Sequence, residues 1–380
     1  MVKRRSLLFF LSCFLILFIL PQPLFAKGPS IQAKAAALID VQSGRVLYEK
    51  NGNERLPIAS LTKIMTAIVA IEEGNLEDKV KVGKNAVGVE GSSIYLRQNE
   101  EMRLEDLLYG LMLRSGNDAA VAIAEHIGGS VDGFVYLMNE KAEFLGLTNT
   151  HFMNPHGLDH PDHYSTAHDL ALLTAYALKN PIFKKIVATK IKNVPMPGEE
   201  WDRKWINKNK MLRLYPGADG IKTGYTKIAN RCLASSATRE GRQLATIVLH
   251  DGNDWNDSMR LLDFGFQEYQ NVEVIPEHYT LDEVLRGKNF TLETMRSSVY
   301  PLQEGELGKV TSKVVWNEEN LKKGFAPSGY LHLFLGKELI DQVPLRIAQK
   351  NDDLKTKKEK QPSFLDKWGI VLQSLIREVS

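Results

Sequence analysis

One helical segment constrains the fold of this chain more than any other feature. Residues 58–74 follow Pro57 and stop at Gly74, a combination that marks the two ends of a helix. The large apolar residues within it point in nearly every direction around the helix axis: Leu61, Ile64, Met65, Ile68, Val69 and Ile71. A helix that is apolar on all sides belongs in a protein core. The chain is therefore predicted to build a folded unit around this segment.

The same segment carries a hydroxyl and an amine. Ser60-Leu61-Thr62-Lys63 is the only Ser-x-x-Lys sequence in the chain. Residues three apart share a helix face, so Lys63 can reach the Ser60 hydroxyl. Burial disfavours the charged form of Lys63, and a neutral lysine can accept a proton from serine. A place in the first helical turn would also favour negative charge developing at Ser60.

Two further short motifs follow in order along the chain. Ser115-Gly116-Asn117 begins 55 residues after Ser60, and Lys222-Thr223-Gly224 begins 162 residues after it. Each motif is weak alone, because Ser-x-x-Lys occurs by chance about once per few hundred residues. Taken singly, the second motif reads equally well as a turn with a helix cap. The order and context of all three predict an active site with Ser60 as nucleophile.

The three motifs and their surroundings resemble the low-molecular-weight penicillin-binding proteins that are D-alanyl-D-alanine carboxypeptidases, peptidase family S11. The similarity covers residues 31–347 and is carried by segments 114–120, 154–158 and 219–226. Segments 109–113 and 253–255 are most similar to the sporulation-type enzyme of endospore-forming bacteria. The resemblance implies an α+β fold. A serine β-lactamase/DD-transpeptidase-like domain would be followed by a small β-rich domain and a C-terminal amphipathic helix.

The resemblance implies three catalytic residues. Ser60 would attack the carbonyl of the penultimate D-alanine and form an acyl-enzyme. Lys63 would accept the proton of Ser60, and Ser115 would relay a proton toward the leaving amine. No metal or other cofactor is implied.

The resemblance also implies a set of substrate-binding residues. They are Asn117, Lys222, Thr223, Gly224 and Tyr225. Asn117 would hold the substrate amide, Lys222 would set the local field, and Thr223 would face the terminal carboxylate. The backbone N–H groups of Ser60 and Tyr225 would form the oxyanion hole.

The implied substrates are peptidoglycan stem peptides, with β-lactam antibiotics as covalent inhibitors. Two alternatives stay open: an endopeptidase that cuts cross-links with the same site, and a β-lactam sensor that acylates without turnover. The Glu-x-x-Leu-Asn sequence of class A β-lactamases is absent between Ser115 and Lys222, which argues against rapid β-lactam hydrolysis. Some relatives have a carboxylate-binding arginine where this chain has Asp254-Trp255. Carboxylate recognition beyond Thr223 is therefore left open.

The N-terminal residues have the pattern of an export signal. Lys3, Arg4 and Arg5 precede a 14-residue apolar run that ends at Leu20, and Ala26 offers a small residue for cleavage. Removing residues 1–26 takes away three basic residues and no acidic ones. That leaves 45 basic against 46 acidic residues, a net charge of −1. Such a balance gives no basic surface for nucleic acid.

Five consecutive segments are predicted. They are the signal peptide (1–26), the peptidase domain (31–270), the β-rich domain (271–347), a basic linker (348–363) and an amphipathic helix (364–380). The helix has one apolar face, with Trp368 suited to the headgroup boundary of an anionic membrane. Docking on the protein itself is the alternative. Together these segments predict a secreted protein held peripherally on the outer face of the cytoplasmic membrane, or on a forespore membrane.

The remaining residues of chemical interest are one cysteine and four histidines. Cys232 lies in a strand-like run and is predicted to be a small buried hydrophobe rather than a nucleophile. The histidines are His156, His160, His163 and His168. Their spacing fits no helix-borne zinc motif, so we expect a polar loop near the rim of the active site.

Overall fold

The computed structural model describes residues 28–196 and 198–348. They form two compact units. The first unit comprises the described residues up to Val274, together with Val299–Val310 and Leu335–Ile340. The second comprises Ile275–Ser298, Thr311–Phe334 and the described residues from Asp341 on. The predicted signal peptide, nearly all of the linker and the amphipathic helix lie outside the described residues. No helix within the described ranges is long and apolar enough to cross a membrane.

The first unit is built on a five-stranded antiparallel sheet with the order β2-β1-β9-β8-β7. Its strands are β1 (Ala35–Asp40), β2 (Val46–Lys50), β7 (Ala218–Thr226), β8 (Asn230–Arg239) and β9 (Arg242–Leu249). The hairpin near the N-terminus thus joins three strands that come about 170 residues later. Strands from the two ends of this unit's sequence therefore enclose a helical middle.

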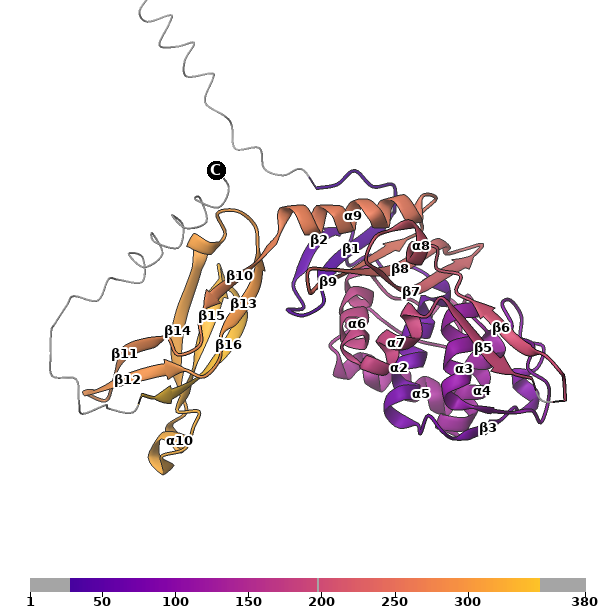
Figure 1. Ribbon diagram of the computed structural model, residues 1–380, viewed down its shortest axis with the longest axis horizontal. Helices are drawn as coiled ribbons and strands as arrows, with labels where there is room; N and C mark the ends of the chain where they lie inside the picture. The colour runs from indigo at the N-terminus through magenta and orange to yellow at the C-terminus, as the bar shows by residue number, and fades with distance from the viewer. Residues whose placement is uncertain (1–27, 197, 349–380) are drawn as a thin grey trace, which may run out of the picture. The chain divides into compact units, whose positions relative to one another are not determined.

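Both faces of this sheet are covered by helices. Along β1, Ala35, Ala37 and Ile39 join one buried cluster, while Ala36 and Leu38 join another. The second cluster also holds residues of α9 (Asp254–Glu268), and the first holds residues of α6 (Ala167–Lys179) and α7 (Pro181–Ala188). Figure 1 shows α9 on one side of the sheet and α6 and α7 on the opposite side. The alternation of strand side chains therefore fills two cores.

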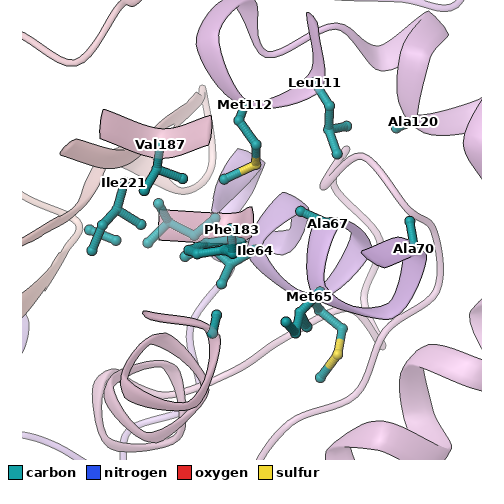
Figure 2. Packing of buried hydrophobic residues seen from close by; sticks show 14 of the residues in the cluster. Ile64, Met65, Ala67, Ala70, Leu111, Met112, Ala120, Phe183, Val187 and Ile221 are labelled. Carbon is teal, nitrogen blue, oxygen red and sulfur yellow. The ribbon is translucent and has the colours of Figure 1, made fainter. Parts of the chain in front are cut away.

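The segment predicted as one helix has two parts. A 3₁₀ turn, η1 (Ala59–Thr62), runs directly into α2 (Lys63–Glu73), which ends at Gly74. Every residue of α2 from Lys63 to Ile71 is buried, as its all-round apolar sequence predicts. Figure 2 shows its Ile64 beside Phe183 and its Met65 pointing to another side of the helix, and all three belong to one buried cluster. Ser60 therefore lies in a 3₁₀ turn, and the expectation that it lies in the first α-helical turn is wrong.

The other elements of the first unit are short helical segments, helices and two strand pairs. The helical elements are η2 (Lys84–Ala86), α3 (Leu104–Tyr109), η3 (Gly110–Arg114), α4 (Asn117–Gly128), α5 (Val131–Phe144) and α8 (Met211–Leu214). The short strands are β3 (Lys79–Lys81), β4 (Glu101–Arg103), β5 (Ile191–Pro195) and β6 (Asp202–Ile206), paired as β3-β4 and β5-β6. At the start of α6, the Thr166 side chain accepts a hydrogen bond from the Asp169 N–H and so caps the helix.

The later part of the chain is rich in strands, which confirms the predicted β-rich C-terminal domain. A five-stranded sheet has the order β11-β12-β16-β15-β14, and a separate pair joins β10 to β13. The elements are β10 (Gln270–Ile275), β11 (Thr280–Leu285), β12 (Lys288–Thr294), β13 (Ser298–Leu302), η4 (Leu307–Lys309), β14 (Val310–Trp316), α10 (Glu318–Lys323), β15 (Gly329–Leu335) and β16 (Glu338–Ile347). The hairpin of β11 and β12 was not anticipated from the sequence.

Candidate active site

Ser60 and Lys63 meet across the 3₁₀ turn. Lys63 Nζ lies 3.1 Å from Ser60 Oγ. A 3₁₀ helix has three residues per turn, so side chains three apart eclipse each other. The turn thus brings hydroxyl and amine together more directly than an α-helix would. Ala59, immediately before Ser60, has a left-handed backbone with φ of +46°, which is uncommon for a residue with a Cβ.

The Lys63 amine is enclosed by three hydrogen-bonding groups. Its Nζ donates to Asn117 Oδ1 at 2.7 Å and to the His156 carbonyl oxygen at 2.6 Å. A neutral amine has two N–H donors and one lone pair. The two oxygens use both donors, which leaves the lone pair for the Ser60 hydroxyl. Lys63 is 0% exposed, so it does not extend to solvent.

Burial and neighbouring cations favour the neutral form of Lys63. Burial first, and then the positive charges of Lys222 and Lys208, hold the pKa of Lys63 well below its ordinary value, against a smaller opposing effect of Asp118. Lys222 is also buried, and burial followed by the charge of Lys208 lowers its pKa to about 7. The influence of Lys222 was anticipated from the sequence. That of Lys208 was not, because no local pattern relates it to the motifs.

Ser115 lies between η3 and α4, and Asn117 is the first residue of α4. Ser115 is buried and has φ of +66°, so it forms a left-handed turn between the two helical elements. Asn117 Oδ1 accepts from Lys63, and its Nδ2 donates to the Glu90 carbonyl oxygen. Both ends of this amide are therefore engaged within the protein, in addition to any contact with substrate.

The third motif lies on β7, an edge strand of the sheet. A methyl group added at Gly224 would lie 3.2 Å from the Ser60 backbone nitrogen, so this strand passes directly beside the 3₁₀ turn that contains Ser60. Side chains alternate along a strand, so Lys222 and Gly224 share the face toward the turn, and Thr223 and Tyr225 share the other. Lys222 Nζ donates to the Thr223 carbonyl oxygen at 2.7 Å. The structure thus brings all three motifs together.

Comparison with known proteins identifies this arrangement. The family model described as D-alanyl-D-alanine carboxypeptidase, peptidase S11, matches residues 23–253. The D-alanyl-D-alanine carboxypeptidase DacF of Bacillus subtilis is 39% identical over 279 residues, which are 70% of this chain and 71% of that protein. DacC of Escherichia coli is 38% identical over 346 residues, 85% of each chain. This chain belongs to the S11 D-alanyl-D-alanine carboxypeptidases.

Solved structures show the same fold for this carboxypeptidase. Penicillin-binding protein 5 of Haemophilus influenzae is 28% identical, with a TM-score of 0.69, and the match covers 85% of this chain and 98% of that one. The predicted family, α+β fold and β-rich C-terminal domain are therefore confirmed. The protein is a serine D-alanyl-D-alanine carboxypeptidase of peptidoglycan, and its family membership implies peptidoglycan peptides as substrates and β-lactam binding.

In the carboxypeptidase, the loop of residues 153–163 is hydrogen-bonded to α2 and packs against the 3₁₀ turn that contains Ser60. The carbonyl oxygens of Pro155 and His156 accept hydrogen bonds from Thr66 Oγ1, at 2.6 Å, and from Lys63 Nζ. Gly157 has φ of +86°, and a methyl group added there would overlap the Ala59 carbonyl oxygen. The sequence suggested this segment only through resemblance, with no role for it. Its backbone carbonyls could not be identified from residue types.

The expected polar histidine loop needs one correction. His163 is buried and hydrogen-bonded to Thr62, whereas His160 is exposed. Within the described ranges, no group of three or more His, Cys, Asp or Glu residues is arranged to hold a metal ion. Cys232 is fully buried, and burial raises the pKa of its thiol to about 12, which agrees with the prediction of a buried, unreactive side chain.

Proposed function

We propose that Ser60 is the nucleophile of this carboxypeptidase and that Lys63 is its general base. The Ser60 Oγ attacks the carbonyl carbon of the penultimate D-alanine while its proton passes to the neutral Lys63 Nζ. The observation that carries this proposal is the surroundings of that nitrogen, where two oxygens take its donors and its lone pair is left for Ser60. A lysine buried beside a second cation is suited to this role at neutral pH.

The tetrahedral intermediate then collapses to an acyl-enzyme. Its oxyanion is held by the backbone N–H groups of Ser60 and Tyr225, which the close approach of β7 to the turn that contains Ser60 supports. The C–N bond breaks and free D-alanine leaves, with its amine protonated through Ser115. Water subsequently attacks the acyl carbon, the proton returns to Ser60, and the shortened stem peptide is released.

Substrate is held along the edge of the sheet. Because β7 is an edge strand, an extended stem peptide can pair with its free backbone groups as an added strand. Thr223 and Lys222 then provide the hydroxyl and positive field for the terminal carboxylate. Asn117 contacts the substrate amide while it keeps its bond to Lys63. Gly224 allows β7 to lie this close to the turn that contains Ser60, since any side chain at this position would press on the turn.

The test measures D-alanine released from a stem pentapeptide that ends in D-Ala-D-Ala. The wild-type protein releases it, and the Ser60→Ala variant releases none above background. A cross-linked dimer peptide assayed in parallel separates this activity from that of an endopeptidase. Faster cleavage of the dimer than of the pentapeptide would replace the carboxypeptidase reading with the endopeptidase one.

The site of action is proposed from the sequence alone. Residues 1–26 direct export, and residues 364–380 hold the mature enzyme on the outer face of the cytoplasmic membrane. Similarity to DacF of the endospore-forming Bacillus subtilis supports a role in the spore cortex as well as in the cell wall. Peptide hydrolysis itself would not depend on the anchor.

A further inference from the structure

The peptide bond between Ala59 and Ser60 has an unusual conformation and a specific partner. Ala59 is held at φ of +46°, in the left-handed region that residues with a Cβ seldom adopt. A trans peptide is planar, so the Ala59 carbonyl and the Ser60 N–H point in opposite directions within one rigid unit. Any group that fixes the direction of the carbonyl therefore also fixes the direction of the Ser60 N–H.

One side chain holds this carbonyl directly, and a second acts through the first. Thr62 Oγ1 donates to the Ala59 carbonyl oxygen at 2.8 Å, and Thr62 Oγ1 itself lies 2.7 Å from His163 Nε2. The backbone N–H of Met153 donates to His163 Nδ1 at 3.0 Å, so Nδ1 carries no hydrogen. In the neutral ring the hydrogen is then on Nε2, which donates to Thr62. The result is a directed chain of hydrogen bonds from His163 through Thr62 to the peptide.

The chain of hydrogen bonds is rigidly enclosed. His163 is 4% exposed and Thr62 is fully buried, and the ring of Phe152 packs edge-on against the imidazole with centroids 5.7 Å apart. Gly157 approaches the Ala59 carbonyl so closely that a methyl group there would overlap it. On the opposite side of the peptide, the Ser60 nitrogen faces Gly224 of β7, next to Tyr225. The donor thus points toward the region where the oxyanion is expected.

We propose that His163 is a positioning residue for acylation, which acts through Thr62 to aim the Ser60 N–H at the oxyanion. This proposal rests on the proposed function of Ser60 as nucleophile. Hydrogen bonds in series polarise one another, so a carbonyl that accepts from Thr62 also makes the N–H of its peptide a stronger donor. His163 touches no reacting atom, and its effect appears only where charge develops on the oxyanion.

Two variants of His163 separate this role from that of a buried structural residue. In His163→Asn the side-chain amide reaches the position of Nδ1, so it can accept from Met153 but ends short of Thr62. In His163→Gln the amide reaches the position of Nε2 and can still donate to Thr62. Both variants remove the ring, so its packing is lost in each. Thr62→Val and Thr62→Ser form a second pair, in which only serine keeps the hydroxyl.

The measurement is stopped-flow acylation by a fluorescent penicillin, analysed for the dissociation constant of the first complex and the acylation rate constant, with thermal unfolding as a check of folding. We expect His163→Gln and Thr62→Ser to acylate within about three-fold of wild type. His163→Asn and Thr62→Val should acylate at least about ten-fold more slowly, with unchanged dissociation constants. We expect this decrease in rate to be smaller than the decrease caused by removing a whole oxyanion donor. Equal acylation rate constants within both pairs would overturn the proposal.

Different results would contradict the proposed nucleophile and the proposed role of His163. If penicillin still labels Ser60→Ala, the nucleophile is wrong and the role of His163 falls with it. If labelling depends on Ser60 but Thr62→Val acylates at the wild-type rate while folded, only the inference about His163 and Thr62 is wrong.

Discussion

Lys63 Nζ lies 3.1 Å from Ser60 Oγ. In the neutral amine, both N–H groups are used by other acceptors, so neither is left to donate to the Ser60 hydroxyl. Asn117 Oδ1 and the His156 carbonyl oxygen accept its two hydrogens. Neither is a carboxylate, so neither favours the charged ammonium as an ion pair would. The surroundings of Lys63 therefore support its proposed role as a proton acceptor.

Replacement of Lys63 should abolish acylation without unfolding the protein. Lys63→Ala removes the base, and general-base catalysis contributes about 10² to 10⁴ in rate, so fluorescent penicillin labelling should slow by at least about 100-fold. The loss of a donor to Asn117 and His156 should cost about 1–3 kcal/mol of stability. Circular dichroism checks the fold, and Lys210→Ala, in the turn before α8, is the matched surface control. Acylation of folded Lys63→Ala at near the normal rate would require another base.

Removal of the Lys222 charge should change the pH dependence of acylation. Lys222 is the strongest cationic influence that lowers the pKa of Lys63, after burial itself. In Lys222→Met the pKa of Lys63 should rise, which shifts the acidic limb of the acylation rate constant to higher pH. The shift should be clearest below pH 7, because Lys222 itself has a pKa of about 7 and is charged there. Lys208→Met should move the limb in the same direction by a smaller amount. A limb that stays in place in both variants contradicts this electrostatic account.

How far the site was readable from the sequence depends on the distance between its parts. The proximity of Ser60 and Lys63 follows from their spacing of three residues. The hydrogen bond between Lys63 and His156 spans 93 positions, and that between Thr62 and His163 spans 101. Local periodicity contains no information on such contacts. The left-handed backbone of Ala59 was equally unpredictable, because it is imposed by the packing of the loop and not favoured by alanine.

The stability of the protein should fall in acid partly because of His163. Burial first, and then His151, His160 and Lys63, lower the pKa of His163 from 6.5 to about 4. Between these values the unfolded chain binds more protons than the native state, so the free energy of unfolding falls as the pH falls from about 6.5 toward 4. The full contribution is roughly 3 kcal/mol. Urea unfolding at pH 7 and pH 4.5 should show a smaller loss in His163→Gln than in wild type. Identical losses would mean that His163 does not titrate in this range.

The C-terminal residues should bind membranes independently of the active site. Burying several large apolar side chains of residues 364–380, at roughly 1.5–3 kcal/mol each, outweighs the ordering of a short helix. Attraction of the lysine-rich linker to anionic lipid adds to this and is screened by salt. In vesicle flotation the mature protein should float, less at high salt but still measurably. A truncated protein that ends at Lys360 should stay in solution with full peptidase activity. Equal flotation of both proteins would exclude the anchor.

The most direct test of the account asks which side chain carries the acyl group. Mature protein is incubated with benzylpenicillin, and its intact mass is measured, followed by peptide mapping of the adduct. We predict one penicilloyl group per molecule, located on Ser60, and no adduct on Ser60→Ala under the same conditions. An adduct of normal amount on Ser60→Ala, or one mapped to another residue such as Ser115, would contradict the assignment of Ser60 as the nucleophile.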